Sequence, residues 1–328
     1  MNNPLVSIIC TCKNSKKYIR QCLESVLKQD YENFEFLIQD GASSDGTVEI
    51  IREYRDKRIK LVTKPDSSPG EAFVGVLSRI QGEVWGSCLS DEEMLPHAIT
   101  WAVHNFSQNP AAAAIYGDSH IIDETGKNIL SSRSRPWNFE QYLCCEIVPP
   151  FSASFFKTES FNKIGYDRYN DCGEFDIWLR LGSVFQINYI PCFVANFRRH
   201  ASSDTSTTSN FYKTLPARIR AIENIADNPE TPDYIRSLKT QAIAGLHLWA
   251  AENFITHGHI REAGEMIMTS LDYTPRQERL VMLCRAFAAA AGIDALIGVY
   301  KPVMDAVAQH FETLEQQHVD DAVIRDKQ

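Results

Sequence analysis

The first 120 residues alternate between short β-rich runs and segments whose apolar residues recur at helical spacing, and this alternation is the strongest constraint on the fold. Between the first two runs, the residues Ile19, Cys22, Leu23, Val26 and Leu27 mark one face of a helix. Alternating β and α units predict an α/β fold with a mostly parallel sheet covered by helices. The expected strands are Leu5–Thr11, Phe34–Gln39, Ile59–Thr63, Glu83–Leu89 and Ala112–Tyr116, and helices are expected at Ala72–Ile80, at Pro96–Phe106 and around Val48, Ile51 and Tyr54.

The rest of the chain divides into a mixed and a helical part. Residues 121–212 contain two short helical patterns, PWNFEQYL and EFDIWLRL, two strand patterns, QINYIP and CFVANFRR, and a Ser/Thr-rich loop, HASSDTSTTSN. From residue 213 to 328 the pattern is helical, and Gly258, Ala263 and Pro275 match a tetratricopeptide-like hairpin. One such repeat cannot bury its own face, which indicates a helical cap or docking surface. We therefore predict domains at 1–212 and 213–328.

Composition excludes several classes of protein. The 328 residues are 44% hydrophobic, and 33 Lys and Arg against 42 Asp and Glu leave a net charge of −9, which argues against nucleic-acid binding. The sequence has no apolar run long enough to span a membrane, and we expect no secretion signal. The nine cysteines lack regular spacing and any C-x-x-C pair, as is typical of reduced thiols. The cytoplasm is the expected compartment.

Two acidic turns follow predicted strands. Asp40 and Asp45 lie in DGASSDGT after FEFLIQ, and Asp91 and Glu92 lie in SDEE after EVWGSCL. Strand ends of a parallel sheet meet at one edge, where ligands bind. Carboxylates there suit Mg²⁺ or Mn²⁺, which keep positions open for phosphate oxygens. Taken singly, each turn can also be a plain helix cap or a favourable charge at a helix N-terminus.

The segments SIICTCKN, DGASSDGT and SDEEMLP, in this order and followed by PFSASFFKTESFNKIGYD, EFDIWLRL and FRRHASS, resemble glycosyltransferase family 2. The resemblance covers roughly residues 4–205. It implies the GT-A fold, with a nucleotide-sugar-binding half at 1–120 and an acceptor-binding half at 121–212. It also implies an inverting transferase that moves a sugar from a nucleotide diphosphate to a hydroxyl group with the help of Mn²⁺ or Mg²⁺.

Residue by residue, the resemblance implies three groups of functional side chains. The nucleotide-sugar would contact Thr11, Asn14, Asp40, Asp45, Asp66, Glu71, Ser90 and Asp91, with Asp40 reading the nucleobase. The metal ion would be held by Asp91, Glu92 and His200. Glu174 matches the catalytic base, and Asp176 or Asp171 would take that role if Glu174 does not. Asp118 matches an acid of less certain function.

Four positions depart from the family pattern. Leu89 occupies the first acid position of the metal-binding D-x-D, Val74 replaces a frequent Asn, and Glu71 and Glu174 each stand where Asp is usual. These departures leave open a second reading, a non-catalytic paralogue that binds nucleotide-sugars. A third reading, a nucleotidyltransferase, lacks support because no Gly-rich phosphate loop with a following basic residue occurs near the N-terminus.

The partners follow from the resemblance as well. Uridine is the commonest base in the family, so a UDP-sugar is the expected donor, and a glycan or lipid-linked glycan in surface polysaccharide biosynthesis is the expected acceptor. The helical tail can dock on the inner face of the membrane, on a partner or on a second copy of the chain. Its mixture of Arg, Glu and apolar residues does not decide among these.

Overall fold

The computed structural model describes residues 3–165, 172–200, 208–273, 275–295, 303, 305–310 and 313. The chain forms two compact units: an α/β unit of Met1–Phe139 and Ile147–Ser203, and a helical unit of Glu140–Glu146 and Asp204–Gln328. The short segment Glu140–Glu146 therefore packs with the helical unit although its sequence neighbours do not. The predicted boundary after residue 212 falls inside helix α8, and the division into functional domains stays a prediction.

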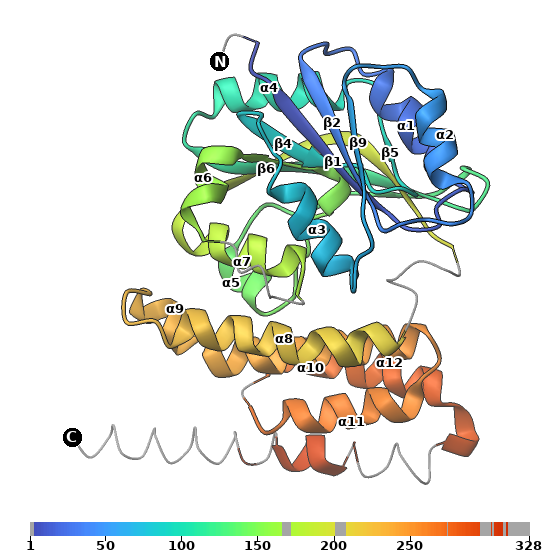
Figure 1. Ribbon diagram of the computed structural model, residues 1–328. Helices are drawn as coiled ribbons and strands as arrows, with labels where there is room; N and C mark the ends of the chain where they lie inside the picture. The colour runs from blue at the N-terminus through green and yellow to red at the C-terminus, as the bar shows by residue number, and fades with distance from the viewer. Residues whose placement is uncertain are drawn as a thin grey trace. The chain divides into compact units, whose positions relative to one another are not determined.

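The first half of the sheet is parallel, as the alternation predicts. Its strands are hydrogen-bonded in the order β3-β2-β1-β4, with one helix between each consecutive pair in sequence (Figure 1). Helix α1 buries Ile19, Cys22, Leu23 and Val26, the face expected from its spacing. The elements are β1 Val6–Cys12, α1 Ile19–Leu27, β2 Phe34–Asp40, α2 Thr47–Glu53, β3 Ile59–Thr63, α3 Pro69–Leu77 and β4 Val84–Ser87.

The second half of the sheet is mixed. It continues from β4 through β8, β6 and β9 to β5, and β7 pairs with β6. Only β6 and β9 run parallel here, and the other pairs are antiparallel. The α/β fold with flanking helices is thus confirmed, with a sheet that is mixed as a whole. The elements are β5 Glu93–Met94, α4 Ala98–Gln108, β6 Ala112–Ile122, β7 Asn128–Ser132, α5 Phe139–Leu143, the 3₁₀ helix Phe151–Ala153, β8 Ser154–Lys157, α6 Thr158–Lys163, α7 Glu174–Val184 and β9 Gln186–Arg198.

The two strands predicted from QINYIP and CFVANFRR are one continuous strand, β9. Its register against β6 shifts between the pairs Tyr116–Tyr189 and Asp118–Phe193, so that Pro191 lies in a bulge. Proline has no N–H for a regular ladder, and a bulge removes that requirement. The sequence pattern breaks at Pro191, but the strand does not.

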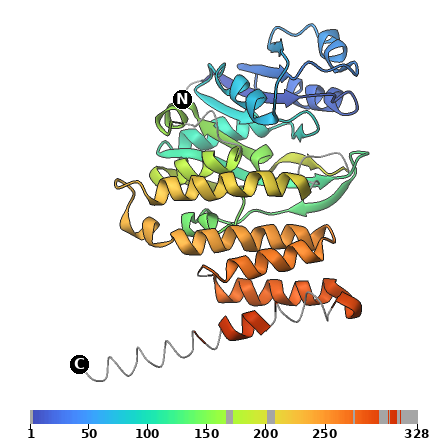
Figure 2. The same ribbon diagram turned by 60° about the horizontal axis from the view of Figure 1, so that its bottom comes forward.

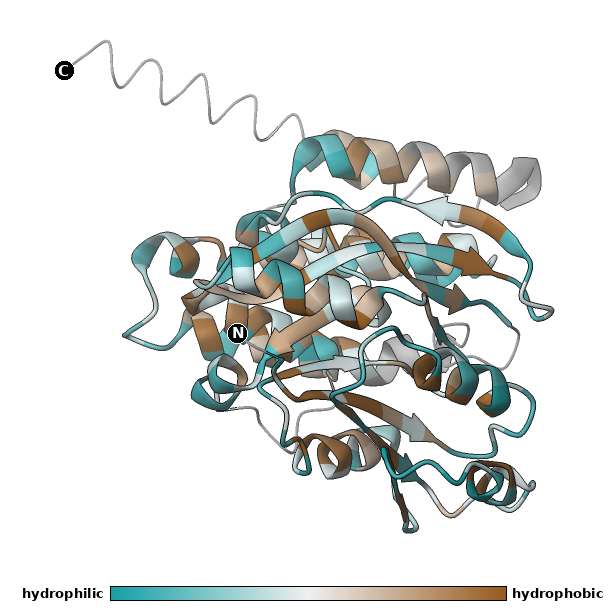
Figure 3. Ribbon diagram, turned by 90° about the horizontal axis from the view of Figure 1, so that it is seen from above, coloured by the Kyte–Doolittle hydropathy of each residue, from teal (hydrophilic) through white to brown (hydrophobic). Residues whose placement is uncertain are grey.

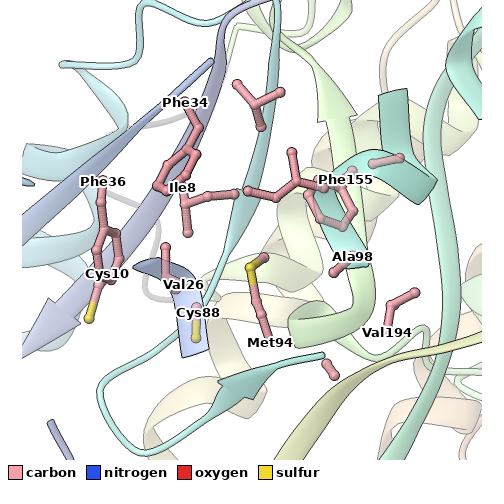
Figure 4. Close-up of a cluster of buried hydrophobic side chains, with 14 of the residues drawn as sticks. Ile8, Cys10, Val26, Phe34, Phe36, Cys88, Met94, Ala98, Phe155 and Val194 are labelled. Carbon is pink, nitrogen blue, oxygen red and sulfur yellow. The ribbon is translucent and has the colours of Figure 1, made fainter. Parts of the chain in front are cut away.

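The core of the α/β unit lies between the sheet and helices α1 and α4 (Figure 4). Alternate residues of β1, namely Val6, Ile8, Cys10 and Cys12, all belong to this cluster, as the two-residue period of a strand requires. Figure 3 shows the apolar residues concentrated along the strands. Also in the cluster are Val26, Phe34, Phe36, Cys88, Met94, Ala98, Phe155 and Val194. Cys88 directly follows β4, so the core reaches the base of the loop that carries Asp91.

In the helical unit, the longer helices α8, α10, α11 and α12 pack side by side (Figure 2). Helix α10 is buried over most of its surface, because it contacts α8, α9, α11 and α12. The expected hairpin is present: α10 and α11 are joined through Gly258, whose φ of 78° suits glycine. The helices are α8 Thr208–Ala226, α9 Asp233–Ser237, α10 Lys239–Thr256, α11 Ile260–Ser270 and α12 Gln277–Ala295.

The Ser/Thr-rich loop expected at residues 200–210 is described only in part. Residues 201–207 lie outside the described part of the chain, and residues 208–210 begin helix α8 rather than continuing a loop. Within the described residues, no helix combines the length and the apolar character that crossing a membrane requires.

Candidate functional site

Most of the residues predicted to bind the nucleotide-sugar lie in the loops that follow the four parallel strands. Asn14 follows β1, the acidic turn of Asp45 follows β2, Asp66 follows β3 and Asp91 follows β4. Because β1, β2, β3 and β4 run parallel, these loops share one edge of the sheet. The sheet topology therefore collects side chains that lie up to 77 residues apart in sequence.

The loop after β1 is bound to the loop after β2. Asn14, with a positive φ of 53°, donates its backbone N–H to Ser43 Oγ at 2.8 Å and accepts the backbone N–H of Ser44 on its Oδ1 at 2.9 Å. Thr11, near the end of β1, is half-buried and pairs with Gln39 of β2. Asn14 is thus held in place by two hydrogen bonds to the loop after β2, and it is exposed at the edge of the sheet.

Asp40 is fully buried at the end of β2. Its Oδ2 accepts the backbone N–H of Ser43 at 3.1 Å, and its Oδ1 accepts the Ser43 hydroxyl. The thiol of Cys12 lies 3.7 Å from the same Oδ1, and burial together with the Asp40 charge raises the pKa of Cys12. Both carboxylate oxygens therefore shape the turn. A direct contact of Asp40 with a nucleobase stays a prediction.

Asp45 also forms bonds within the loops. Its Oδ2 accepts the backbone N–H of Lys16 at 2.9 Å, and its Oδ1 accepts the N–H and hydroxyl of Thr47 at 3.0 and 2.5 Å. Burial alone raises the pKa of Asp45, but these hydrogen bonds outweigh it and the pKa is lowered. The hydroxyls of Ser15 and Ser90, 2.8 Å apart, then join the β1 loop to the β4 loop.

Asp66 lies against the backbone of Gly41 and pairs with Lys13. The Lys13 Nζ to Asp66 Oδ1 distance is 2.9 Å, and the Asp66 side chain is only 8% exposed. Glu71 lies nearby in sequence, in the first turn of α3. Its Oε2 accepts the backbone N–H and the hydroxyl of Ser67 at 2.9 and 2.7 Å, while Ser68 caps the helix. Glu71 is exposed, and the Ser67 hydrogen bonds lower its pKa.

A contact between two distant segments joins Asp91 to His200. His200 Nε2 lies 2.9 Å from Asp91 Oδ2, across 109 residues of sequence. Two adjacent ligands of an octahedral ion such as Mg²⁺, each about 2.1 Å from the metal, are about 3 Å apart. In this structure the two side chains are hydrogen-bonded to each other, and they supply one carboxylate oxygen and one imidazole nitrogen, donor types that suit Mn²⁺. Among the residues that the structure describes, no cluster of three or more His, Cys, Asp or Glu side chains is arranged for metal binding.

Glu92 points into the protein. It is 5% exposed, and its Oε2 accepts the backbone N–H of Leu89 at 3.0 Å. Burial, and then the charges of Asp91 and Glu174, raise its pKa to about 8 against the hydrogen bond from Leu89. Glu92 therefore lies behind Asp91, close enough to Glu174 for the two carboxylates to interact. Its predicted role as a metal ligand stays a prediction.

The two candidate catalytic acids lie in the first turn of α7. Glu174 is exposed, whereas Asp176 is 1% exposed and its Oδ2 accepts the Nε–H of Arg180 at 2.7 Å. Asp176 and Arg180 thus form an i, i+4 ion pair whose acid is buried. The third candidate acid, Asp171, lies outside the described residues.

Three contact residues of the site are not among the predicted ones. Arg198 contacts the Asp91 carbonyl, the Tyr18 ring lies against the His200 ring at a tilt of 35°, and Ser43 binds both Asp40 and Asn14. The segment FRRHASS contains Arg198, but nothing in the sequence separates it from Arg199. Asp118, matched to an active-site acid, is 1% exposed and accepts hydrogen bonds from Ser134 N and Tyr189 Oη.

Comparisons with known proteins bear on the family and on the fold. Residues 7–164 match the sequence profile of glycosyl transferase family 2. The chain is 27% identical over 194 residues to a chondroitin synthase of Escherichia coli, covering 57% of this chain and 28% of that protein. It is 23% identical over 194 residues to a hyaluronan synthase of Pasteurella multocida, covering 57% of this chain and 20% of that protein. The chain thus spans well under half the length of these relatives.

Two solved structures share the fold. S. aureus TarS 1-349 in complex with UDP-GlcNAc has a TM-score of 0.63 at 17% identity, with 93% of this chain and 91% of that chain covered. The mannosyltransferase PcManGT from Pyrobaculum calidifontis, in complex with GDP-Man and Mn²⁺, has a TM-score of 0.57 at 16% identity, with 94% and 85% covered. Residues 7–164, just under half of the chain, thus match glycosyl transferase family 2, and the chain has a GT-A-like α/β fold followed by a helical C-terminal region.

Proposed function

We propose that this protein transfers a sugar from a nucleotide diphosphate donor to a hydroxyl of a glycan or lipid-linked glycan, with inversion at the anomeric carbon. The observation that carries the proposal is the contact of Asp91 with His200 on the same sheet edge as the β1, β2 and β3 loops. The family and the relatives in polysaccharide synthesis support this chemistry. A UDP-sugar is the donor that we expect.

In this proposal Asp91 and His200 hold a divalent cation, Mn²⁺ or Mg²⁺. When bound, such an ion supplies Lewis-acid stabilisation of the negative charge that develops on the departing diphosphate. Asp91 provides a carboxylate oxygen and His200 an imidazole nitrogen, both acceptable donors for Mn²⁺. The Mn²⁺ in the complex of PcManGT is consistent with this assignment. Glu92, the third predicted ligand, is buried next to Asp91.

We assign the catalytic base to Glu174. An acceptor hydroxyl is a weak nucleophile until a positioned base removes its proton, and this help typically contributes ~10²–10⁴-fold to the rate. Glu174 is exposed at the start of a buried helix, so its carboxylate can reach a ligand while its backbone is fixed. Asp176 is less suited, because it is buried against Arg180.

The donor would lie across the loops after β1, β2 and β3. Asn14 and Ser90 offer amide and hydroxyl groups at this edge, and the Lys13–Asp66 pair offers a donor beside an acceptor. Asp40 and Asp45 hold the turn that presents these groups, since their oxygens are engaged by Ser43, Thr47 and Lys16 N. In this proposal the loops after β1, β2 and β3 together bind the nucleotide.

The test begins with ligand binding. Thermal unfolding is measured with UDP-, GDP-, dTDP- and CMP-sugars, each with Mn²⁺ and with EDTA, because a ligand that binds only the folded state raises the melting temperature. We expect a shift with one nucleotide class that is larger with Mn²⁺. The selected donor is then incubated with protein, and release of the nucleoside diphosphate is followed.

The base is tested by Glu174→Gln, with Glu159→Gln as the matched control, since Glu159 is an exposed acid in the first turn of α6. We expect Glu174→Gln to lose ~10²-fold or more of the turnover with donor binding retained, and Glu159→Gln to match the wild type. Donor binding without turnover in the wild type would favour the non-catalytic reading. No binding of any donor would overturn the proposal.

A further inference from the structure

Arg198 is a fully buried arginine at the end of β9, and it joins three segments of the α/β unit. Its Nε–H donates to the backbone carbonyl of Asp91 at 3.0 Å, and its Nη1 donates to the carbonyl of Asp123 in the β6–β7 turn, also at 3.0 Å. Its Nη2 pairs with the carboxylate of Glu93. One guanidinium thus binds the loop after β4, strand β5 and the β6–β7 turn.

Tyr18 connects this arginine to His200. Its buried ring lies 4.9 Å from the Cζ of Arg198 and 4.9 Å, between centroids, from the His200 ring. The guanidinium therefore reaches Asp91 through a hydrogen bond and His200 through an aromatic ring. Both members of the Asp91–His200 pair are anchored to the same side chain.

We propose that Arg198 and Tyr18 are positioning residues that hold Asp91 and His200 at the separation a divalent cation requires. This inference rests on the proposed function, because it assigns the pair to a cation. Neither residue touches the cation or the donor: Arg198 acts on the Asp91 main chain, and Tyr18 acts on the orientation of the His200 ring.

The geometry needs arginine in particular. A guanidinium carries five N–H donors in a rigid planar fork, whereas a lysine ammonium carries three donors at a single atom. The Asp91 carbonyl and the Asp123 carbonyl are bound by different nitrogens of the fork, and the Glu93 carboxylate by the third. A lysine at position 198 keeps the charge for Glu93 but cannot span both carbonyls.

We call Arg198 and Tyr18, with their contacts to Asp91 and His200, the brace. Charge balance explains why the charged Arg198 of the brace is stable inside the protein. A buried cation is strongly unfavourable unless an anion and hydrogen bonds compensate it. Glu93 supplies the anion, and its other oxygen accepts the Nδ2–H of Asn196 at 3.1 Å. The carboxylate of Asp91 is consequently not needed to neutralise Arg198, and it remains available to His200 and to a cation.

The experiment measures Mn²⁺ binding directly. The loss of the free Mn²⁺ signal in electron paramagnetic resonance is titrated for the wild type, Arg198→Lys, Tyr18→Leu and Glu93→Gln. Arg199→Lys and Tyr18→Phe are the matched controls, because Arg199 is exposed and Phe retains the ring. Binding of the nucleoside diphosphate selected in the donor panel is measured in EDTA for every protein.

We expect Arg198→Lys, Tyr18→Leu and Glu93→Gln to weaken Mn²⁺ binding about 10- to 100-fold, the usual effect of removing residues that orient metal ligands. Nucleotide binding in EDTA should be unchanged, and both controls should bind Mn²⁺ like the wild type. If Arg198→Lys does not fold, Tyr18→Leu and Glu93→Gln decide the question through the same two measurements.

Three results would overturn the inference. Folded variants that bind Mn²⁺ like the wild type would exclude the brace and leave the proposed function intact. A parallel loss of Mn²⁺ and nucleotide binding would indicate a general structural role. A wild-type protein that binds nucleotide but no Mn²⁺ would remove the metal from the proposed function, and the brace with it.

Discussion

A β-carbon on Gly41 would lie 2.2 Å from Oδ2 of Asp66, so the loop after β2 and the loop after β3 meet where a larger residue than glycine would have to displace the Asp66 side chain. The same carboxylate is paired through its Oδ1 with Lys13 of the β1 loop. The packing of the loops after β1, β2 and β3 thus depends on the absence of a β-carbon at position 41. This contact yields the first prediction.

Gly41→Ala should displace Asp66 and weaken binding of the donor nucleotide at least tenfold, with a loss of about 1–3 kcal/mol of stability from overpacking. Gly75→Ala is the control, because its new methyl would meet only the Gln39 side chain at 3.4–3.8 Å. Gly75 lies within α3, so its replacement by alanine should raise stability by up to about 1 kcal/mol. Titration calorimetry and urea unfolding measure both effects. Unchanged nucleotide affinity in Gly41→Ala would show that Asp66 does not contact the donor.

Asp176→Asn should destabilise the protein by about 1–3 kcal/mol, because it removes the charged partner of a hydrogen-bonded pair whose acid is buried. The matched change is Glu159→Gln on α6, which breaks a pair with the same i, i+4 spacing in which both side chains are exposed. That change should leave the unfolding midpoint where it is in the wild type. Equal midpoints for the two variants in urea would contradict the prediction.

Glu92 should make stability fall with rising pH. Its pKa is raised from 4.5 to about 8 by burial and by Asp91. Below pH 4.5 both the folded and unfolded states hold the proton, whereas between 4.5 and 8 only the folded state keeps it. The free energy of unfolding then decreases by up to about 1.4 kcal/mol per pH unit. Above pH 8 both states have lost the Glu92 proton, and Glu92 no longer changes the free energy of unfolding with pH.

This pH dependence is measured by urea unfolding in EDTA at several values between pH 5 and 8, for the wild type and Glu92→Gln. Glutamine keeps the shape of the side chain but does not titrate, so its curve should lack this component. Curves of equal slope for the two proteins would indicate that Glu92 is already ionised in the folded protein at pH 5.

Gly245→Ala should destabilise the helical unit by about 1–3 kcal/mol, although alanine is the better helix former. An added β-carbon on Gly245 of α10 would lie 2.3 Å from the carbonyl oxygen of Cys144. Gly258→Ala is a contrasting case, since nothing lies within 4 Å and only the positive φ of 78° is unfavourable. It should cost about 1 kcal/mol.

Thermal unfolding of the two glycine variants separates the two causes. Serine at position 245 should be as damaging as alanine, whereas asparagine at position 258 should restore most of the loss because Asn tolerates a positive φ. A stabilised Gly245→Ala would mean that the segment Glu140–Glu146 can move away from α10 without cost.

The early elements could be predicted from local patterns. Leu5–Thr11 and Phe34–Gln39 correspond to β1 and β2 within a residue, and Ile59–Thr63 matches β3. These strands are short, apolar and bounded by polar turns, so local composition decides them. Strand β9 was split in the prediction because Pro191 interrupts its pattern, and the bulge that admits the proline depends on the register with β6.

The gathering of the acidic turns at one edge of the sheet could be predicted, but the burial and the partners of the individual acids could not. The acids at the ends of β2 and β4 were found because parallel strands present their carboxyl ends together. Which of the candidate acids are buried and which are accessible could not be found this way. Asp40, Glu92 and Asp176 are buried and engaged inside the protein, whereas Asp91 and Glu174 are accessible.

The sequence by itself determined the α/β alternation, the edge of the sheet that carries the acidic turns and the resemblance to glycosyltransferase family 2, because each rests on residue types at short spacing. Only the tertiary structure decided that Arg198 rather than Arg199 supports Asp91, and that Glu140–Glu146 packs with the distant helices. Burial and pairing depend on segments 50 to more than 100 residues apart, and no local pattern encodes the distance between them.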